Sequence, residues 1–357
     1  MFFNSAKNLI SQSSLGVDIG TTSIKVVELG KGGKRPELKN YGILETYNHL
    51  ERGNMAIQTS SLKIAETDTA ELLKSLIKQA RFSTKNAVAS IPPFSAFITL
   101  FELPQMTDQE VSKTMNFQIS QYIPMPLDEV SIEWRKVGER QDDQGFVKQQ
   151  ILLVSIPNET VARYKNIFRT AGLNLTALEV ESQSLIRSLA FSADEPILLV
   201  DIGSRSTDII VISEGEMRYN HQTDYSSSSL TYAIAQGLGI NVKRAEKLKK
   251  DKGLLGGQTS ELSTLMIPHL DAIINEIRRA QNKYEQAFGN KIGFIALSGG
   301  GAKLLGMEKY IESKMGLPVS ISNPFSLLDY PANLEPIIKD IGPSFSVAVG
   351  LALKDLV

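Results

Sequence analysis

Short apolar stretches separated by polar turns predict strands at the start of the chain. Residues 15–29 are mostly apolar on both sides of a Gly-Thr-Thr-Ser turn, and a further strand is predicted at 38–46, after the glycine-rich turn 30–34. Residues 66–80 instead carry apolar side chains three and four positions apart, which predicts a helix. A strand at 86–91 ends at a pair of prolines. The beginning of the chain therefore predicts a sheet covered by a helix.

The segment 94–172 has a pattern of its own. Thr107 and Glu110 have the spacing of a capping box, which predicts the start of a helix. This segment predicts a subdomain inserted in the first half of the chain. Its expected elements are a strand at 96–103, a helix from Thr107 to about 121, strands at 130–137 and 147–156 around a polar turn at 138–145, and a helix at 158–171 that ends at Gly172.

The second half of the chain predicts mainly helices. Residues 194–196 indicate a linker, and Pro268 either bends the longest helix or marks its true start. The expected elements are a helix at 178–191, strands around 200 and at 209–212, helices at 223–237, 242–250 and 261–288, a strand at 292–297, a helix at 303–315 and a small-residue helix at 342–353.

The pattern Val-Asp-Ile-Gly-x-x-Ser occurs twice, at 17–23 and at 200–206. Glycine lets backbone N–H groups approach phosphate oxygens, and Ser and Thr add side-chain donors. An Asp at the strand end suits a hydrated Mg²⁺. A single copy would be read as an ordinary hairpin turn. Two copies predict a nucleotide-phosphate clamp formed by two half-domains that close on one nucleotide.

A third glycine-rich element supports nucleotide binding. Residues 299–301 are three consecutive glycines between the predicted strand 292–297 and the predicted helix 303–315. Glycines at this place let the backbone lie against a ligand near a helix N-terminus. The order of the three elements along the chain therefore predicts a nucleotide site.

Composition narrows the function classes. The chain has 357 residues, a formal net charge of −1 and no cysteine, which excludes disulfides and thiolate chemistry and gives no indication of nucleic-acid binding. His49, His221 and His269 are scattered, so a zinc site is not predicted. No apolar stretch approaches the roughly 20 residues that cross a bilayer, and the start does not resemble a secretory signal. We therefore expect a cytoplasmic protein.

These elements, in this order, resemble the actin/Hsp70/FtsA-like ATPase superfamily. Within it the sequence is most similar to the PilM family of type IV pilus assembly proteins, at residues 16–29, 171–173, 317–319 and 323–325. The resemblance implies an α/β, actin/Hsp70-like duplicated ATPase fold with an inserted FtsA-type 1C (SHS2-like) subdomain. The implied first domain (1A) comprises 1–93, 173–195 and 341–357, the insert (1C) 94–172, and the second domain (2A/2B) 196–340.

The resemblance also implies ATP or ADP with Mg²⁺. Asp18 and Asp201 would face the metal through water. Lys25 would either reach a phosphate or point to solvent, and Glu246 and Lys249 would either line the nucleoside or form an exposed helical ion pair. The residues implied around the nucleotide are Gly20, Thr21, Thr22 and Ser23 in the first turn, Gly203, Ser204, Ser206 and Thr207 in the second, and Gly299, Gly300, Gly301 and Ala302 beneath ribose and adenine.

Catalysis is implied less directly. Glu181, with Glu179 second, matches the carboxylate that orients the attacking water in related ATPases, although a surface or helix-terminal carboxylate explains either residue as well. FtsA-like second turns usually run Gly-Gly-Thr-Thr, whereas this chain has Arg205 within that turn. Its guanidinium either adds positive charge that retains the nucleotide or points outward. At most slow ATPase activity is expected.

The implied partner is the short cytoplasmic N-terminal segment of a PilN-type inner-membrane protein. FtsA proteins end in an amphipathic membrane helix, whereas this chain stops at Val357, so we expect recruitment to the cytoplasmic face of the inner membrane through the partner. A groove between the insert and the first domain would hold the segment. Apolar residues there either line the groove or form the core of the insert: Phe94, Phe97, Ile98, Phe101, Leu103, Met106, Met115, Phe117, Tyr122 and Ile123.

Two other function classes remain open. An FtsA- or MreB-type filament would self-associate into ATP-dependent polymers. A small-molecule kinase of the same superfamily would need a catalytic Asp in a substrate pocket, for which the sequence offers no clear candidate. The pattern also does not separate a type IV pilus platform from a type II secretion platform.

Overall fold

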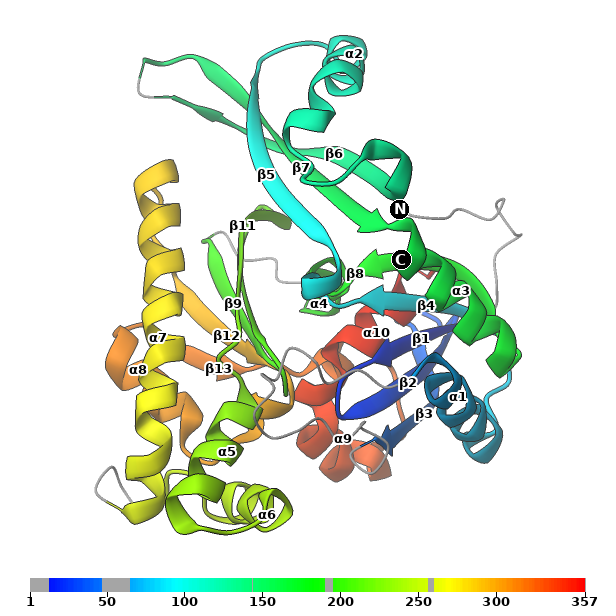
Figure 1. The fold of residues 1–357 in the computed structure, drawn as a ribbon, viewed down its shortest axis with the longest axis vertical. Helices are drawn as coiled ribbons and strands as arrows, with labels where there is room; N and C mark the ends of the chain where they lie inside the picture. The colour runs from blue at the N-terminus through cyan, green and yellow to red at the C-terminus, as the bar shows by residue number, and fades with distance from the viewer. Residues whose placement is uncertain (1–12, 47–64, 143, 190–194, 256–259, 357) are drawn as a thin grey trace.

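Two five-stranded sheets form the two halves of the molecule, and a three-stranded sheet lies at one end (Figure 1). The computed structural model describes residues 13–46, 65–142, 144–189, 195–255 and 260–356. Helices cover the faces of both large sheets, which is why their central strands are apolar on both sides.

The first sheet has the order β3-β2-β1-β4-β8. Strands β1 to β3 are antiparallel, and β4 and β8 continue the sheet in parallel with β1. Leu15 and Val17 of β1 lie in one core with Leu73 of α1, because successive side chains of a strand point to opposite faces. The elements are β1 (Ser13–Ile19), β2 (Ser23–Gly30), β3 (Glu37–Glu45), α1 (Glu66–Ala80), β4 (Asn86–Ile91), α3 (Asn158–Ala171), β8 (Asn174–Val180) and α4 (Glu181–Leu189).

The second sheet repeats this topology, in the order β11-β10-β9-β12-β13. Its first three strands are antiparallel, and β12 and β13 are parallel to β9. The sheets are thus duplicates, as the repeated motif predicts. The elements are β9 (Ile197–Ile202), β10 (Thr207–Ser213), β11 (Glu216–Thr223), α5 (Ser227–Leu238), α6 (Val242–Lys252), α7 (Glu261–Phe288), β12 (Phe294–Ser298), α8 (Met307–Met315) and β13 (Val319–Ile321).

The insert forms the sheet at the end of the molecule, in the order β5-β7-β6. It comprises β5 (Phe97–Pro104), α2 (Asp108–Gln118), β6 (Val130–Gln141) and β7 (Val147–Pro157). The capping box predicted from Thr107 and Glu110 is confirmed at the start of α2. Helix α3, the last element of the predicted insert 94–172, packs against α1 and β8 and so covers the first sheet.

The chain ends in two helices, of which the first is largely exposed and the second lies in the centre of the molecule. They are α9 (Glu335–Ile341) and α10 (Ser346–Leu353), and every residue of α10 is buried. Within the described residues, one helical run, Ala332–Leu353, is long and apolar enough to cross a membrane, which the sequence pattern did not predict. Since 67% of its most apolar window is buried inside the fold, this run is accounted for as core.

Some predicted helix starts are wrong, whereas the predicted start of the longest helix, at Glu261, is confirmed. Residues 178–180 belong to β8 and the helix begins only at Glu181, because parallel pairing with β4 outweighs the local helical spacing. Residues 216–223 form the edge strand β11, and α5 starts at Ser227 rather than at 223. Helix α8 starts at Met307, not at 303. Pro268 lies inside α7, whose start is capped by Ser260. Residues 190–191 of the predicted helix and Asp194 of the linker lie outside the described residues.

Candidate functional site

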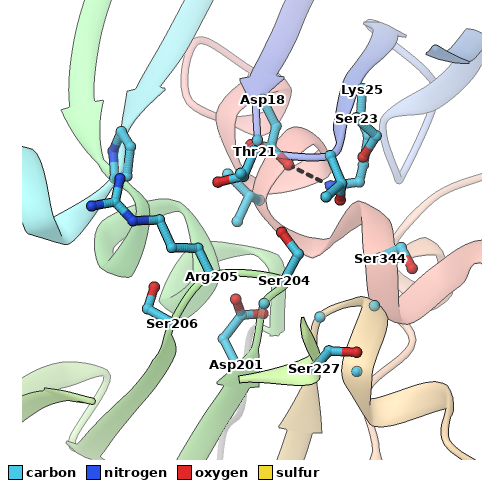
Figure 2. Close-up of a pocket in the computed structure, with 18 of the residues that line it drawn as sticks. Asp18, Thr21, Ser23, Lys25, Asp201, Ser204, Arg205, Ser206, Ser227 and Ser344 are labelled. Carbon is cyan, nitrogen blue, oxygen red and sulfur yellow. Dashed lines mark hydrogen bonds and ion pairs between the residues drawn. The ribbon is translucent and has the colours of Figure 1, made fainter. Parts of the chain in front are cut away.

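A cavity of about 670 Å³ lies between the two large sheets, and both copies of the repeated motif line it (Figure 2). The glycines of the third element close another side. The first residues of α4 and α5 and parts of α3 and α6 complete the wall. The three predicted nucleotide elements, which lie far apart in the sequence, therefore meet at one cavity.

The first turn is closed by its own backbone. The Gly20 N–H donates to the Ser23 carbonyl at 3.0 Å, and Thr46 donates its N–H to the Thr22 carbonyl at 2.9 Å. Asp18 and Lys25 are cross-strand partners on β1 and β2, and Lys25 Nζ lies 2.9 Å from Asp18 Oδ2 (Figure 2). Lys25 thus faces the cavity rather than solvent. Burial lowers the pKa of Lys25, but the neighbouring carboxylates outweigh burial and raise it above its ordinary value.

The second turn repeats this geometry. The Gly203 N–H donates to the Ser206 carbonyl at 2.9 Å, as in the first turn. Asp201 pairs across the strands with Asp208, at the register where the first copy pairs Asp18 with Lys25. Where the first copy has a cation, the second therefore has another carboxylate.

These carboxylates are held in an unfavourable environment. Burial raises the pKa of Asp201 to about 6, and burial together with Asp201 raises the pKa of Asp208 well above its ordinary value. One carboxyl oxygen of Asp208 is buried with no hydrogen-bond partner among the described residues. The second copy thus has two buried carboxylates with no cation paired across the strands, which is the condition that a bound cation relieves.

Mg²⁺ fits this donor set. It is a hard cation that prefers oxygen ligands and retains several waters. In the described part of the chain no three His, Cys, Asp or Glu side chains form a ready-made metal cage. Asp18 and Asp201 both line the cavity, so a hydrated ion held through water suits the site better than a fully coordinated one.

Of the two candidate catalytic carboxylates, Glu181 lines the cavity. It is the first residue of α4, and burial together with the charges of Asp18, Asp208 and Asp201 raises its pKa well above the ordinary value. Glu181 is half-buried and begins α4, so it lies at the cavity, and the alternative reading as a helix-N-terminal carboxylate stays open.

Glu179 has a structural role instead. It lies 6% exposed on β8 and accepts two hydrogen bonds from Arg187, at 2.7 and 3.1 Å, and one from Lys354 at 2.6 Å. Burial raises the pKa of Glu179, but these cations outweigh burial and lower it below its ordinary value. Glu179 thereby ties the end of the chain to β8.

Glu246 and Lys249 of α6 form a largely buried pair on the cavity wall. Lys249 Nζ lies 2.7 Å from Glu246 Oε2 and donates to the Ser227 carbonyl, the Ser227 hydroxyl and the Thr231 hydroxyl at 2.7 to 3.0 Å. The Lys249 side chain is 6% exposed and that of Glu246 17%. The alternative of a solvent-exposed helical ion pair is therefore wrong for these residues.

Two of the implied contacts do not reach the cavity. Thr207 is fully buried and donates its hydroxyl to the Tyr225 carbonyl at 2.7 Å. Ala302 is fully buried behind the glycines and packs in the core of the second domain. Cavity-lining residues from the prediction are Asp18, Gly20, Thr21, Thr22, Ser23, Lys25, Glu181, Asp201, Gly203, Ser204, Ser206, Glu246, Lys249, Gly299, Gly300 and Gly301.

The structure adds residues that the sequence pattern did not identify. Thr160, Arg163 and Tyr164 of α3 line the cavity, although α3 was predicted only as part of the insert. Ser227 and Ser228 also line it, and their N–H groups bind the Gly203 and Ser204 carbonyls at 3.0 and 3.2 Å. The serine cluster at 226–229 was a visible signal, since it suits a helix start, but nothing local placed it at the site.

Arg205 lines the cavity, so the alternative that it points outward is wrong. Its guanidinium lies over the ring of Phe94, 3.7 Å from the ring centroid. Phe94 lies in the turn Pro93–Ser95, where the chain leaves the first sheet for the insert. The contact therefore joins the second phosphate turn to the first residues of the insert.

The apolar residues expected in a partner groove divide into three sets, which are buried, exposed and partly buried. Leu103, Met115 and Ile123 are buried in the core of the insert, so they do not line a groove. Phe94, Phe97 and Phe117 are 39%, 37% and 83% exposed. The partly buried residues Phe101, Met106 and Tyr122 pack on the insert core, and Ile98 packs on the core of the first domain.

The chain is similar to proteins of known families. The chain matches the family model described as type IV pilus assembly protein PilM over residues 16–356. It is 22% identical to the cell division protein FtsA of Enterococcus hirae, over 90% of this chain and 84% of that protein. It is 28% identical to FtsA of Borreliella burgdorferi over 49% of this chain, and spans 47% of that relative.

Solved structures give the same fold. A PilM–PilN type IV pilus biogenesis complex has a TM-score of 0.81 and 24% identity, over 98% of this chain and 100% of that one. MreB5 of Spiroplasma citri bound to ADP has a TM-score of 0.56 and 13% identity, over 96% and 95%. The duplicated actin-like ATPase fold is thereby confirmed, and the MreB5 example with this fold carries a nucleotide.

Proposed function

The chain belongs to the type IV pilus assembly protein PilM family, and from this premise we propose that it is a cytoplasmic, ATP-binding adaptor of the inner-membrane pilus platform. The observation that carries the proposal is the meeting of two equivalent phosphate turns across one cavity. In each turn the N–H of a glycine donates to a carbonyl three residues on, at 3.0 Å in one copy and 2.9 Å in the other. Such a pair can hold the phosphates of ATP or ADP from both sides.

The residues that line the cavity suggest where each part of the nucleotide would bind. Gly20 to Ser23 and Gly203 to Ser206 supply donors to the phosphates, with Lys25 as the nearby cation. The glycines at 299–301 line the cavity where ribose and adenine would lie, and the Glu246–Lys249 pair would supply polar groups on the nucleoside side. Asp18 and Asp201 would hold the Mg²⁺ through water, and the ion would screen the phosphate charge.

Glu181 is the residue that would orient a water against the terminal phosphate. Its place at the start of α4 beside Asp18 suits this role, which is positional rather than covalent. Arg205, which occupies a turn position normally kept small, is held on Phe94. We therefore expect slow hydrolysis and long retention of the nucleotide.

We further propose that the partner is the cytoplasmic N-terminal segment of a PilN-type membrane protein. The similar solved structure is a PilM–PilN complex, which supports this choice. Strand β5 is an edge of the insert sheet, and Phe97 at its start is 37% exposed, so an extended segment has both an edge and an apolar contact available. The groove would lie between the first domain and the insert, with domain boundaries as implied by the resemblance.

Titration of the protein with a synthetic PilN-type N-terminal peptide tests the adaptor role. Binding that Phe97→Ala weakens, while Phe146→Ala leaves it unchanged, is the expected result. Phe146 is 63% exposed at the far tip of the β6–β7 hairpin, so it controls for loss of any exposed aromatic ring. Light scattering measures polymer formation in the presence of MgATP. Polymers together with no peptide binding would instead favour the filament function.

A further inference from the structure

The insert is connected to the second domain as well as to the first. Strand β11, the edge of the second sheet, packs against β5 and β6 of the insert. In the ribbon view β11 lies directly below the insert sheet (Figure 1). The insert therefore spans the two halves of the molecule that the nucleotide cavity separates.

One connection is buried. Arg218 of β11 is 7% exposed, and its guanidinium donates to the Val137 carbonyl at 2.6 Å and to Gln150 Oε1 at 3.2 Å. It fills the space beside Gly138, where a Cβ atom would lie 1.4 Å from Arg218 Nη1. The insert strand is thus shaped around an arginine from the second domain.

A second connection involves three parts of the fold at once. Arg135 of β6 binds both carboxyl oxygens of Glu216 on β11, at 2.9 and 2.7 Å. The same guanidinium donates to Gln183 Oε1 at 2.9 Å. Gln183 lies on α4, two residues after Glu181, which faces the nucleotide cavity. Arg135 therefore joins the insert, the second domain and the helix that begins in the site.

We propose that Arg135 is a positioning residue that transmits nucleotide occupancy to the insert. Closure of the two halves on a nucleotide moves β11 relative to α4, and Arg135 is bound to both. The guanidinium then either follows one partner or shifts β6, and with it the insert. This inference rests on the proposed nucleotide site, and the experiment separates the two.

The chain contains one tryptophan, and its position makes the insert directly observable. Trp134 precedes Arg135 on β6 and packs against the core of the insert. Neighbouring residues of a strand point to opposite faces, so Trp134 reports the packing of β6 without contacting the Arg135 junction itself. Its emission is therefore a signal of the insert alone.

The test measures Trp134 emission while calorimetry records binding of MgATP and of its non-hydrolysable analogue MgAMPPNP. We expect the emission to change on binding in the natural chain and to lose most of this change in Arg135→Gln and Glu216→Gln. Lys136→Gln is the matched control: Lys136 is the next residue, and its ion-pair partner Glu139 lies within the same strand. The control should keep the emission change.

The outcomes are distinguishable. Heat of nucleotide binding with unchanged Trp134 emission in the natural chain would overturn this inference and leave the nucleotide site intact. An equal loss in Lys136→Gln and Arg135→Gln would also overturn it. Absence of binding heat would overturn the proposed function, and this inference with it. Where a PilN-type peptide binds, we expect MgATP to change its affinity by about 5- to 150-fold, and Arg135→Gln to bring that factor close to one.

Discussion

Asp201 combines a functional position with an energetic penalty. It is the penultimate residue of β9, beside the second phosphate turn, and burial raises its pKa to about 6. A carboxyl group with a raised pKa in the folded state binds its proton more tightly there than in the unfolded chain. Its contribution to the free energy of unfolding therefore falls as pH rises from about 4 to 6. The negative charge of Asp201 that destabilises the fold would also attract a hydrated Mg²⁺.

Asp201→Asn should separate these two effects. At pH 7, without Mg²⁺ or nucleotide, the variant should unfold at a higher temperature than the natural chain, because an uncompensated buried charge is removed. Its affinity for MgATP should fall by about 10- to 100-fold, the scale of hydrogen bonds to charged groups. Thermal unfolding and calorimetry measure the two quantities. A variant that is less stable yet binds MgATP normally would contradict the assignment.

Glu179→Gln addresses the buried ion cluster rather than the site. Removing the carboxylate leaves Arg187 and Lys354 without their shared partner, so we expect a loss of about 3 kcal/mol in the free energy of unfolding at pH 7. The lowered pKa of Glu179 means that its contribution is present above the unfolded value of about 4.3 and disappears as pH falls through the folded value. Denaturant unfolding at pH 7 and below pH 4 should show the difference shrinking.

The control for that measurement is Glu139→Gln. Glu139 pairs with Lys136 at 2.6 Å, but both side chains are well exposed, at 41% and 38%. Its loss should change the free energy of unfolding by less than about 1 kcal/mol. Equal effects of the two substitutions would show that the buried cluster is not special.

For individual residues, the sequence predicted those cavity residues that belong to the repeated motif. Asp18 and Asp201 follow from the repeat itself. Tyr164 and Asp208 could not be predicted, because Tyr164 reaches the cavity only through the packing of α3 on the first sheet. Asp208 reaches it only through its register with Asp201 across β9 and β10. Both depend on pairings between elements rather than on local sequence.

Helix α10 lies at the centre of the first domain, between its sheet and α4. It packs against β1 and α4, and all of its residues are buried. A Cβ atom added at Gly350 would lie 1.9 Å from the Ser184 carbonyl oxygen of α4. The small residues of α10 therefore allow α4, which carries Glu181, to pack closely against it.

Gly350→Ala should consequently destabilise the fold by about 1–3 kcal/mol, the usual cost of overpacking a core. Gly300→Ala is the matched substitution, since its Cβ would meet only the Ser344 hydroxyl, at 3.7 Å, within 4 Å. Gly300 lines the cavity, so its variant should keep the stability of the natural chain and weaken MgATP binding. Thermal unfolding with and without MgATP distinguishes the two variants. A stable Gly350→Ala together with a destabilised Gly300→Ala would contradict the packing argument.

Elements with strong periodicity were predicted well, whereas those defined by tertiary pairing were not. Helix α7 was predicted with both of its ends correct, from its apolar spacing. Strand β11 is polar on much of its length because it is a sheet edge, so no apolar run indicated it. Strand β8 has a sequence that also suits a helix, and only pairing with β4 decides its conformation.

The whole molecule consists of two copies of one sheet topology with a cavity between them. The duplication was predictable because it left a repeated motif in the sequence. The attachment of the insert to the second domain was not, since Arg135 and Arg218 are ordinary charged residues until the fold brings their partners near. Nucleotide binding between the halves should stabilise both, as a ligand that binds only the folded state must.

The most direct test of the account is a calorimetric titration of the purified chain with MgATP, repeated for Asp18→Asn. We predict saturable binding with one nucleotide per chain, strongly dependent on Mg²⁺, and at least tenfold weaker in Asp18→Asn. One order of magnitude corresponds to about 1.4 kcal/mol, less than a hydrogen bond to a charged group commonly contributes. No binding by the natural chain, or equal affinity in Asp18→Asn, would contradict the claim that the two turns hold a nucleotide with its metal.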